Sequence, residues 1–71
     1  MEEVRAMMAG NVWKVLVSPG DQVEADQDIV ILESMKMEIP IAAEEAGIVK
    51  EVSVDEGDFV NEGDLIAIIE P

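Results

Sequence analysis

Histidine and cysteine are both absent from this chain of 71 residues. Their absence excludes zinc, haem, iron–sulfur and thiol sites, and it leaves no disulfide to stabilise the fold. A catalytic site would therefore have to use carboxylates, serine or one of three lysines. A chain of this length forms one small domain, in which about 60% of the unfolded surface is buried. We expect a single domain that spans residues 1–71.

Basic residues are scarce: four lysines and arginines stand against 17 aspartates and glutamates, which gives a net charge of −13. Nucleic acids and anionic membrane surfaces are polyanions, so this charge argues against either as a partner. The longest apolar runs, residues 29–32 and 65–69, are far shorter than the ~20 residues that cross a bilayer. The start, Met1-Glu2-Glu3, also lacks the basic segment of a signal peptide. We expect a soluble, cytoplasmic protein.

Hydrophobic residues make up 49% of the chain, and valine and isoleucine are prominent among them. Disordered acidic segments are poor in such residues. The acidic residues are also scattered, without the block of about five or six like charges that marks an acidic tail. The composition therefore favours a folded domain with a β-branched core under a solvated acidic surface.

The chain contains an internal repeat with an offset of 37 residues. Residues 10–33 align with residues 47–70 without a gap, and ten of the 24 aligned pairs are identical. The identical residues are structural in kind, since they are turn residues such as Gly10 and Gly47 or β-branched residues typical of strands. Two copies predict a duplicated domain with approximate two-fold symmetry rather than a solenoid.

Each half has the pattern of β structure, because short runs of strong β-formers are interrupted by Pro-Gly-Asp and Glu-Gly-Asp turns. The valines expected to face inward are spaced by three residues and then by two: Val12, Val15 and Val17, and again Val49, Val52 and Val54. Strict alternation requires even spacing, so we predict a β-bulge near residues 13–14 and another near residues 50–51. Asp26 stands where the second copy has Gly63. If that turn requires a positive φ, aspartate can adopt it at some strain.

The same offset predicts where the segment between the repeats lies. Residues 2–8 correspond to residues 39–45, so the first strand matches the strand that leaves this segment. Lys36, at the centre of the segment, corresponds to a position just outside the chain ends. We therefore predict a small barrel or sandwich with an exposed hairpin around Lys36 at one end and both termini at the other.

Lys36 lies in the run Glu33-Ser34-Met35-Lys36-Met37-Glu38 and is the only lysine predicted at the apex of a hairpin. Lys14 and Lys50 fall in the two bulge regions, as ordinary solvated strand lysines do. The two methionines offer the apex a flexible, polarizable contact surface. The position alone leaves two interpretations open. Lys36 is either a modification site on a rigid tip or an ordinary turn lysine, beside methionines that complete the edge of the core.

The run from Glu33 to Glu38 resembles the attachment motif of the biotinyl/lipoyl carrier family, in which a glutamate and a small residue precede a lysine between two methionines. The glycines, valines and Gly-Asp turns of both halves agree with the family pattern, and the resemblance covers residues 4–70. The chain is most similar to the biotin carboxyl carrier type, especially to small free-standing attachment proteins. Ser34 is a departure, since many biotin carriers have alanine there.

This resemblance implies an all-β fold, a flattened antiparallel barrel of two four-stranded sheets with Lys36 on an exposed hairpin. It implies that biotin protein ligase joins biotin to the Lys36 amine and recognises the residues around it: Glu33, Ser34, Met35, Met37 and Glu38. The carried biotin would take up CO2 at a biotin carboxylase and release it at a carboxyltransferase. The carrier itself would contribute no catalytic residue, hold no metal and act as a monomer. The gapless repeat leaves no room for the protruding thumb of many acetyl-CoA carboxylase carriers.

The nearest alternative is a lipoyl carrier of a 2-oxo acid dehydrogenase or a glycine-cleavage system, with lipoate on the same lysine. That group resembles Glu-Thr-Asp-Lys-Ala at the site, so Met35 and Met37 weigh against it. A second alternative is an unmodified acidic β-domain that binds a protein, in which Lys36 would be incidental.

Two further alternatives depend on the acidic residues. A calcium site would need regularly spaced ligands, and this spacing is absent from two acidic groups: Asp21, Asp26 and Asp28, and Asp55, Glu56 and Asp58. A hydrolase with a pair of carboxylates would need a cleft that excludes water. The gapless repeat contains no insertion that would form one.

Overall fold

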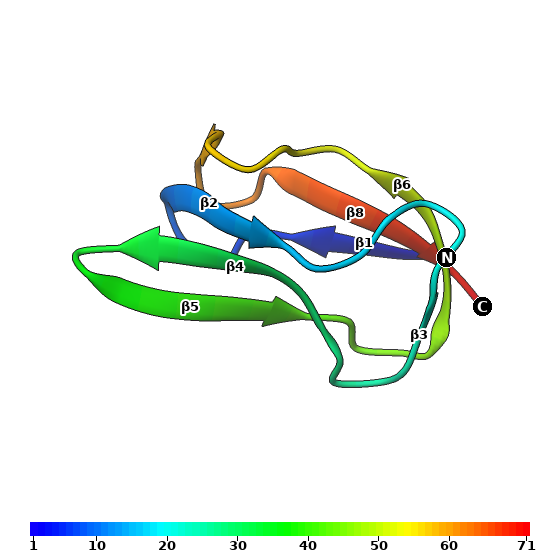
Figure 1. Cartoon of the computed structure of the whole chain (residues 1–71). Helices are drawn as coiled ribbons and strands as arrows, with labels where there is room; N and C mark the ends of the chain where they lie inside the picture. The colour runs from blue at the N-terminus through cyan, green and yellow to red at the C-terminus, as the bar shows by residue number, and fades with distance from the viewer.

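Eight β-strands and no helix make up the fold in a computed structural model that describes residues 1–71. The strands are β1 (Glu2–Arg5), β2 (Gly10–Val15), β3 (Gln22–Val23), β4 (Asp28–Ser34), β5 (Met37–Ala42), β6 (Gly47–Val52), β7 (Phe59–Val60) and β8 (Leu65–Glu70). They form two antiparallel four-stranded sheets, ordered β1-β8-β6-β3 and β5-β4-β2-β7 (Figure 1). We call the first the terminal sheet, because β1 and β8 are the first and last strands, and the second the hairpin sheet, because it contains the β4–β5 hairpin. The expected fold of two four-stranded sheets is confirmed.

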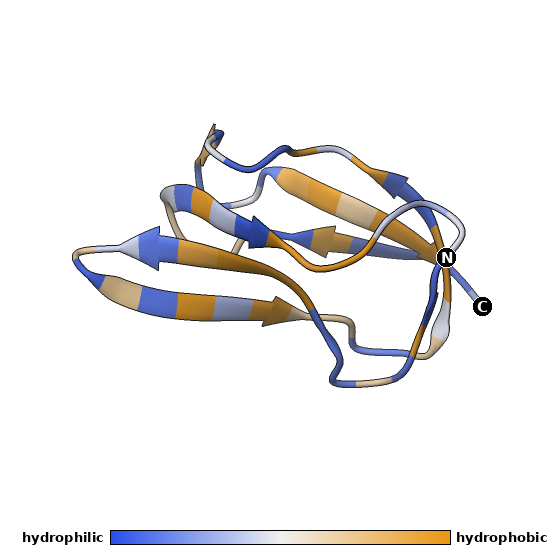
Figure 2. Cartoon of the chain, in the orientation of Figure 1, coloured by the Kyte–Doolittle hydropathy of each residue, from blue (hydrophilic) through white to orange (hydrophobic).

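The core lies between the two sheets. Successive side chains of a strand point to opposite faces, and the hydropathy of the strands alternates accordingly along several of them (Figure 2). Most of the β-branched and aliphatic side chains on the inner faces are less than one-tenth exposed: Val4, Ala6, Val12, Val17, Val23, Ile29, Val30, Leu32, Ile41, Ala43, Val49, Val54, Val60, Ile66, Ala67 and Ile69. No charged or polar side chain is buried among them. The acidic residues therefore all lie on the surface or at its edge.

Backbone hydrogen bonds repeat with the offset of 37 residues. The amide of Gly20 donates to the carbonyl of Val49 at 2.7 Å, and the amide of Gly57 donates to the carbonyl of Val12 at 2.8 Å. Each bond therefore joins one half of the chain to the other. The offset also converts the order β5-β4-β2-β7 into β1-β8-β6-β3. The predicted two-fold symmetry is confirmed, and neither half is a separate unit, because each completes the other's sheet edges.

Both predicted bulges are present. The pairing of β2 with β4 shifts between Val12 and Lys14, and the pairing of β6 with β8 shifts between Val49 and Glu51. Trp13 is the residue within the first shift, and Lys50 occupies the corresponding place in the second. Each bulge lets the valines on both sides of it face the core despite their odd spacing.

Four similar turns connect the strands within the halves. In each turn an amide donates to a carbonyl three residues earlier in the chain, as from Asp21 to Ser18 at 3.0 Å and from Asp58 to Asp55 at 3.0 Å. The third residue of every turn has a positive φ, and for Asp26 this angle is 66° against 89° for Gly63. Aspartate therefore does adopt the conformation that its glycine counterpart adopts.

Several carboxylates of the suggested calcium groups stabilise these turns instead. The Oδ2 atom of Asp21 accepts a hydrogen bond from the amide of Ser18 at 2.8 Å, and that of Asp58 accepts one from Asp55 at 2.8 Å. Aspartate commonly closes turns in this way.

The β4–β5 hairpin and the chain termini lie at opposite ends of the molecule, as the symmetry predicts (Figure 1). The Cα atoms extend over 33 × 18 × 18 Å, and the hairpin forms one end of the long axis (Figure 1). The first half contains no additional element between β2 and β4 beyond the short strand β3. None of the elements is a helix with the length and apolar character needed to cross a membrane.

Candidate functional site

The candidate site is the turn that joins β4 to β5. Ser34 pairs with Met37, so only Met35 and Lys36 remain to reverse the chain. Their φ angles are 52° and 65°. Two consecutive positive φ values are the mark of a type I′ turn, whose twist matches that of the flanking strands. This turn is usually formed by asparagine and glycine, so the methionine and the lysine hold a strained backbone.

The position of the turn differs in one detail from the sequence-based expectation. The sequence places Lys36 at the apex with a methionine on each side. In the structure the apex lies between Met35 and Lys36, and Met37 is already the first residue of β5. The difference arises because a two-residue turn has no single central residue. Met35 thus neighbours Lys36 within the turn, whereas Met37 belongs to the strand ladder.

The hairpin extends beyond the strand beside it. On one side of β4 the last paired residue is Glu33, which lies opposite Asn11 of β2. Ser34 lies beside Gly10, the first residue of β2, so Met35 and Lys36 project past β2. On its other side the hairpin has no neighbouring strand, because β5 is an edge strand. A side chain at Gly10 would come within 3.0 Å of the carbonyl of Glu33. The base of the hairpin is thus packed tightly against β2 while its tip stands free.

The side chains at the tip are open to solvent. Met35 is 91% exposed and Met37 is 64% exposed, and Lys36 is exposed as well. Ser34 is half-buried at the base of the turn. The amine of Lys36 is therefore carried on a short rigid strand pair, with two unusually exposed apolar side chains beside it.

Two carboxylates face each other just below the tip. Glu33 of β4 lies directly opposite Glu38 of β5, and both are exposed. Like charges in directly opposed positions of a sheet destabilise the pair. The arrangement gives the hairpin a concentrated negative charge on the side of the sheet that faces away from the core.

The other two lysines have local partners. The Nζ atom of Lys14 lies 5.5 Å from the centre of the Trp13 ring, and that of Lys50 lies 3.4 Å from a carboxylate oxygen of Glu70. Both lie mid-strand at the bulges, as the sequence predicts. Lys36 forms no ion pair in the structure. The three lysines are therefore in different environments, and only Lys36 stands on a projecting element.

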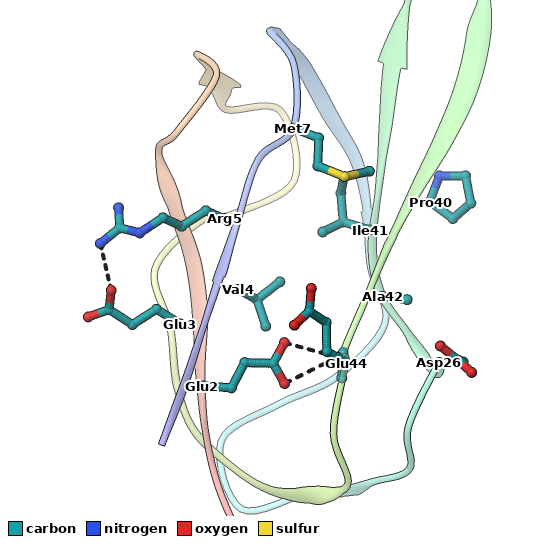
Figure 3. A pocket seen from close by; sticks show the side chains of 11 residues that line it. Glu2, Glu3, Val4, Arg5, Met7, Asp26, Pro40, Ile41, Ala42 and Glu44 are labelled. Atoms are coloured by element: carbon teal, nitrogen blue, oxygen red, sulfur yellow. Dashed lines mark hydrogen bonds and ion pairs between the residues drawn. The ribbon is translucent and has the colours of Figure 1, made fainter.

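Neither of the two surface cavities involves the hairpin tip. One of about 430 Å³ lies at the valines Val15, Val17, Val52 and Val54. The other, of about 340 Å³, is a groove between the edge strands β1 and β5 (Figure 3). No residue from 33 to 38 lines either cavity.

The groove between β1 and β5 is bridged by Glu2. Its carboxylate accepts hydrogen bonds from the amide of Glu44 at 2.9 and 3.1 Å (Figure 3). It also accepts one from the amide of Glu45 at 3.1 Å. These bonds join β1, an edge strand of the terminal sheet, to the segment that follows β5, an edge strand of the hairpin sheet. Glu2 thus contributes to the contact between the two sheets at this groove, and Lys36 takes no part in the groove.

Comparison with known proteins places this architecture in a family. The family model described as "Biotin-requiring enzyme" matches residues 2–69. A biotin/lipoyl attachment protein of Bacillus subtilis is 65% identical over 63 residues, which cover 89% of this chain and 86% of that protein. A biotinylated protein TB7.3 homolog of Mycobacterium leprae is 54% identical over 68 residues, which cover 96% of both chains.

A solved structure shares both sequence and fold. The urea carboxylase of Kluyveromyces lactis superposes on 97% of this chain with a TM-score of 0.91 and 36% sequence identity. The matched part is 6% of that larger chain. Together with the family match, these similarities confirm the resemblance drawn from the sequence. The chain belongs to the biotin/lipoyl attachment family and is a carrier domain of the biotin type, not an enzyme.

Proposed function

We propose that Lys36 is the residue that receives biotin, and that the biotinylated chain carries a carboxyl group between the active sites of a biotin-dependent carboxylase. The observation that best supports this proposal is the geometry of the turn. Lys36 is exposed on a two-residue turn that projects beyond the neighbouring strand. Another enzyme can therefore enclose this amine on several sides without unfolding the carrier.

The strain of the turn supports the same site. Positive φ angles at two adjacent residues other than glycine cost free energy, and such strain is concentrated at functional positions. An asparagine or a glycine would form the same turn at less cost. The methionine and the lysine are thus better explained by what they present to another protein than by what they contribute to the fold.

In the attachment step, the amine of Lys36 would attack the carboxyl carbon of a biotinyl-adenylate held by biotin protein ligase. An amide bond forms, and adenylate leaves. A lysine amine in water is almost entirely protonated at neutral pH, so the ligase must remove a proton from it before the attack. In the free chain Lys36 forms no ion pair with Glu33 or Glu38 of the same hairpin, so neither carboxylate is placed at the amine to remove that proton.

In the working cycle, the attached biotin would take up CO2 at a biotin carboxylase and deliver it at a carboxyltransferase. Neither cavity of the chain lies at the hairpin, so the attached ring would have no pocket of its own here. The tether would instead raise the effective concentration of the ring at each active site in turn. The charge of −13 would steer the carrier towards basic surfaces on these enzymes.

Co-expression with biotin protein ligase tests the attachment site. We expect intact mass spectrometry to show one biotin per chain, and we expect Lys36→Arg to abolish it while Lys14→Arg and Lys50→Arg retain it. Arginine keeps the positive charge but cannot form the amide under these conditions, so the variants differ only in the available amine. Biotin at Lys14 or Lys50, or on no residue, would contradict the assignment, and the mass of lipoate would indicate the lipoyl alternative.

A further inference from the structure

The two-fold symmetry provides an internal comparison of the two outer faces of the protein. Positions on the outer face of the hairpin sheet have counterparts, offset by 37 residues, on the outer face of the terminal sheet, except close to the tip, where Glu38 corresponds to Met1 ahead of β1. The two positions of such a pair occupy equivalent places in the strand order and in the register. A chemical difference between them therefore does not arise from the needs of the fold.

The aromatic residues differ most between the two faces. Trp13 and Phe59 are the only aromatic residues in the chain, and both lie on the outer face of the hairpin sheet. Trp13 is 43% exposed and Phe59 is 61% exposed. Their counterparts on the terminal sheet are Lys50 and Gln22.

The neighbouring positions extend this difference. Pro40 of β5 lies beside Ile31 on the hairpin sheet, and its counterpart on the terminal sheet is Glu3. One position differs in the opposite sense, because Ile48 on the terminal sheet corresponds to Asn11. The outer face of the hairpin sheet thus combines both aromatic rings with Pro40, whereas the terminal sheet has polar or charged side chains in these three places.

This apolar face is continuous with the hairpin. Phe59 pairs with Asn11, Asn11 pairs with Glu33, and Glu33 pairs with Glu38, so these four side chains form one row across the sheet. Adjacent strands are about 4.8 Å apart, which places Phe59 roughly 10 Å from Glu33. Any protein that encloses the tip from this side therefore also covers the row.

We propose that the outer face of the hairpin sheet, with Trp13 and Phe59 as its anchors, is the surface that binds biotin protein ligase. This inference rests on the proposed attachment at Lys36. Tryptophan is among the side chains that most often dominate the binding energy of an interface, and phenylalanine is enriched in interfaces. The opposed carboxylates of Glu33 and Glu38 call for basic groups on the ligase next to an apolar pocket.

The ligase and the carboxylase enzymes differ in how closely they must approach the hairpin, because biotin is a long arm once it is attached. The ligase has to bring the amine of Lys36 itself into bonding distance of the adenylate, so its surface must come close to the base of the hairpin. A carboxylase or carboxyltransferase needs only the ring at the far end of the biotinyl arm. Its surface can therefore stay farther from the sheet.

The symmetry also supplies the variants for a test. Trp13→Lys and Phe59→Gln introduce the residues that the counterpart positions already accommodate, so the fold has a precedent for both. We expect the double variant to raise the KM of the ligase for the carrier about tenfold or more, with little change in kcat, because anchors of this kind act on binding. Ile48→Asn is the matched control. It removes an exposed apolar residue from the terminal sheet and introduces the residue found at the counterpart position, Asn11, so it should leave KM unchanged.

Binding to a chain that cannot be modified separates this inference from the proposed function. In the Lys36→Arg chain labelled with fluorotryptophan, the single Trp13 signal should shift in fluorine NMR when the ligase is added, and the Phe59→Gln change should weaken that binding. An unchanged Trp13 signal or an unchanged KM in the double variant would overturn the proposed surface, even if Lys36 is biotinylated normally. A double variant that is biotinylated normally but carboxylated poorly would also overturn it, because the face would then serve the carboxylase.

Discussion

Ser34 and Met37 face each other at the end of the β4–β5 ladder, and this pairing leaves Met35 and Lys36 as the whole turn. The φ angle of Met35 is 52°, in a region where asparagine is far more common than methionine. The pairing of Ser34 with Met37 thus determines that Met35 and Lys36 are the residues with a strained backbone.

Replacement of Met35 by asparagine should therefore stabilise the fold. We expect Met35→Asn to raise the free energy of unfolding by about 0.5–1 kcal/mol, because asparagine tolerates the left-handed region better. Urea denaturation measures this change. Met37→Asn is the control, since Met37 lies in β5 with an ordinary φ and asparagine is a poor strand former. Equal stabilisation by both variants would contradict the assigned turn.

Mild oxidation with hydrogen peroxide should follow the exposure of the methionines. Met35 is 91% exposed and Met8 is 40% exposed, so we expect Met35 to form sulfoxide first and Met8 last among the five methionines. Peptide mass spectrometry over a time course measures each rate. A rate at Met35 as slow as that at Met8 would mean that the tip is covered in solution.

Two equivalent glycines should differ in their tolerance of alanine. A Cβ atom at Gly47 would overlap the carbonyl oxygen of Glu70, whereas one at Gly10 would lie 3.0 Å from the carbonyl oxygen of Glu33. Overpacking of this kind costs typically about 1–3 kcal/mol, so we expect Gly47→Ala to lower the unfolding free energy by about 3 kcal/mol and Gly10→Ala by about 1 kcal/mol. Thermal or urea unfolding compares them. Equal losses of unfolding free energy would contradict the closer packing of Gly47 against Glu70 than of Gly10 against Glu33.

The carboxylate of Glu2 should contribute more to stability than that of Glu3. Glu2 accepts hydrogen bonds from the amides of Glu44 and Glu45, whereas Glu3 forms only an exposed ion pair with Arg5 at 2.8 Å. We expect Glu2→Ala to cost about 1 kcal/mol and Glu3→Ala less than about 0.5 kcal/mol. Hydrogen exchange at the amides of Glu44 and Glu45 should also accelerate in Glu2→Ala alone. Unchanged exchange there would contradict the bridge between the two edge strands.

Much of the fold could be predicted because the pattern of strands and turns occurs twice in the sequence, in residues 10–33 and 47–70. The odd spacing of the valines predicts bulges near residues 13–14 and 50–51, and the structure has them at Trp13 and Lys50. The alignment of Asp26 with Gly63 raises the question whether this turn requires a positive φ, and the structure has φ angles of 66° and 89° there. Such features are local, so comparison of the two halves is sufficient to find them.

The details of the site could be predicted only in part. The repeat places Lys36 on a hairpin opposite the termini, but the turn contains neither glycine, asparagine, aspartate nor proline to indicate its type. Its two residues are determined by the register of β4 with β5, in which Leu32 pairs with Ile39. That register depends on which side chains reach the core, and a shift by one residue would turn each of them to solvent.

The sequence by itself determined the β-sandwich, its symmetry, the two bulges and the place of Lys36, because these depend on periodicity and on turn residues that recur in both halves. Only the tertiary structure decided which residues share a face. Trp13 of β2 and Phe59 of β7 come from different halves, and they lie on one surface because the halves exchange their short strands between the sheets. Such a contact between distant segments leaves no periodic signal in the chain.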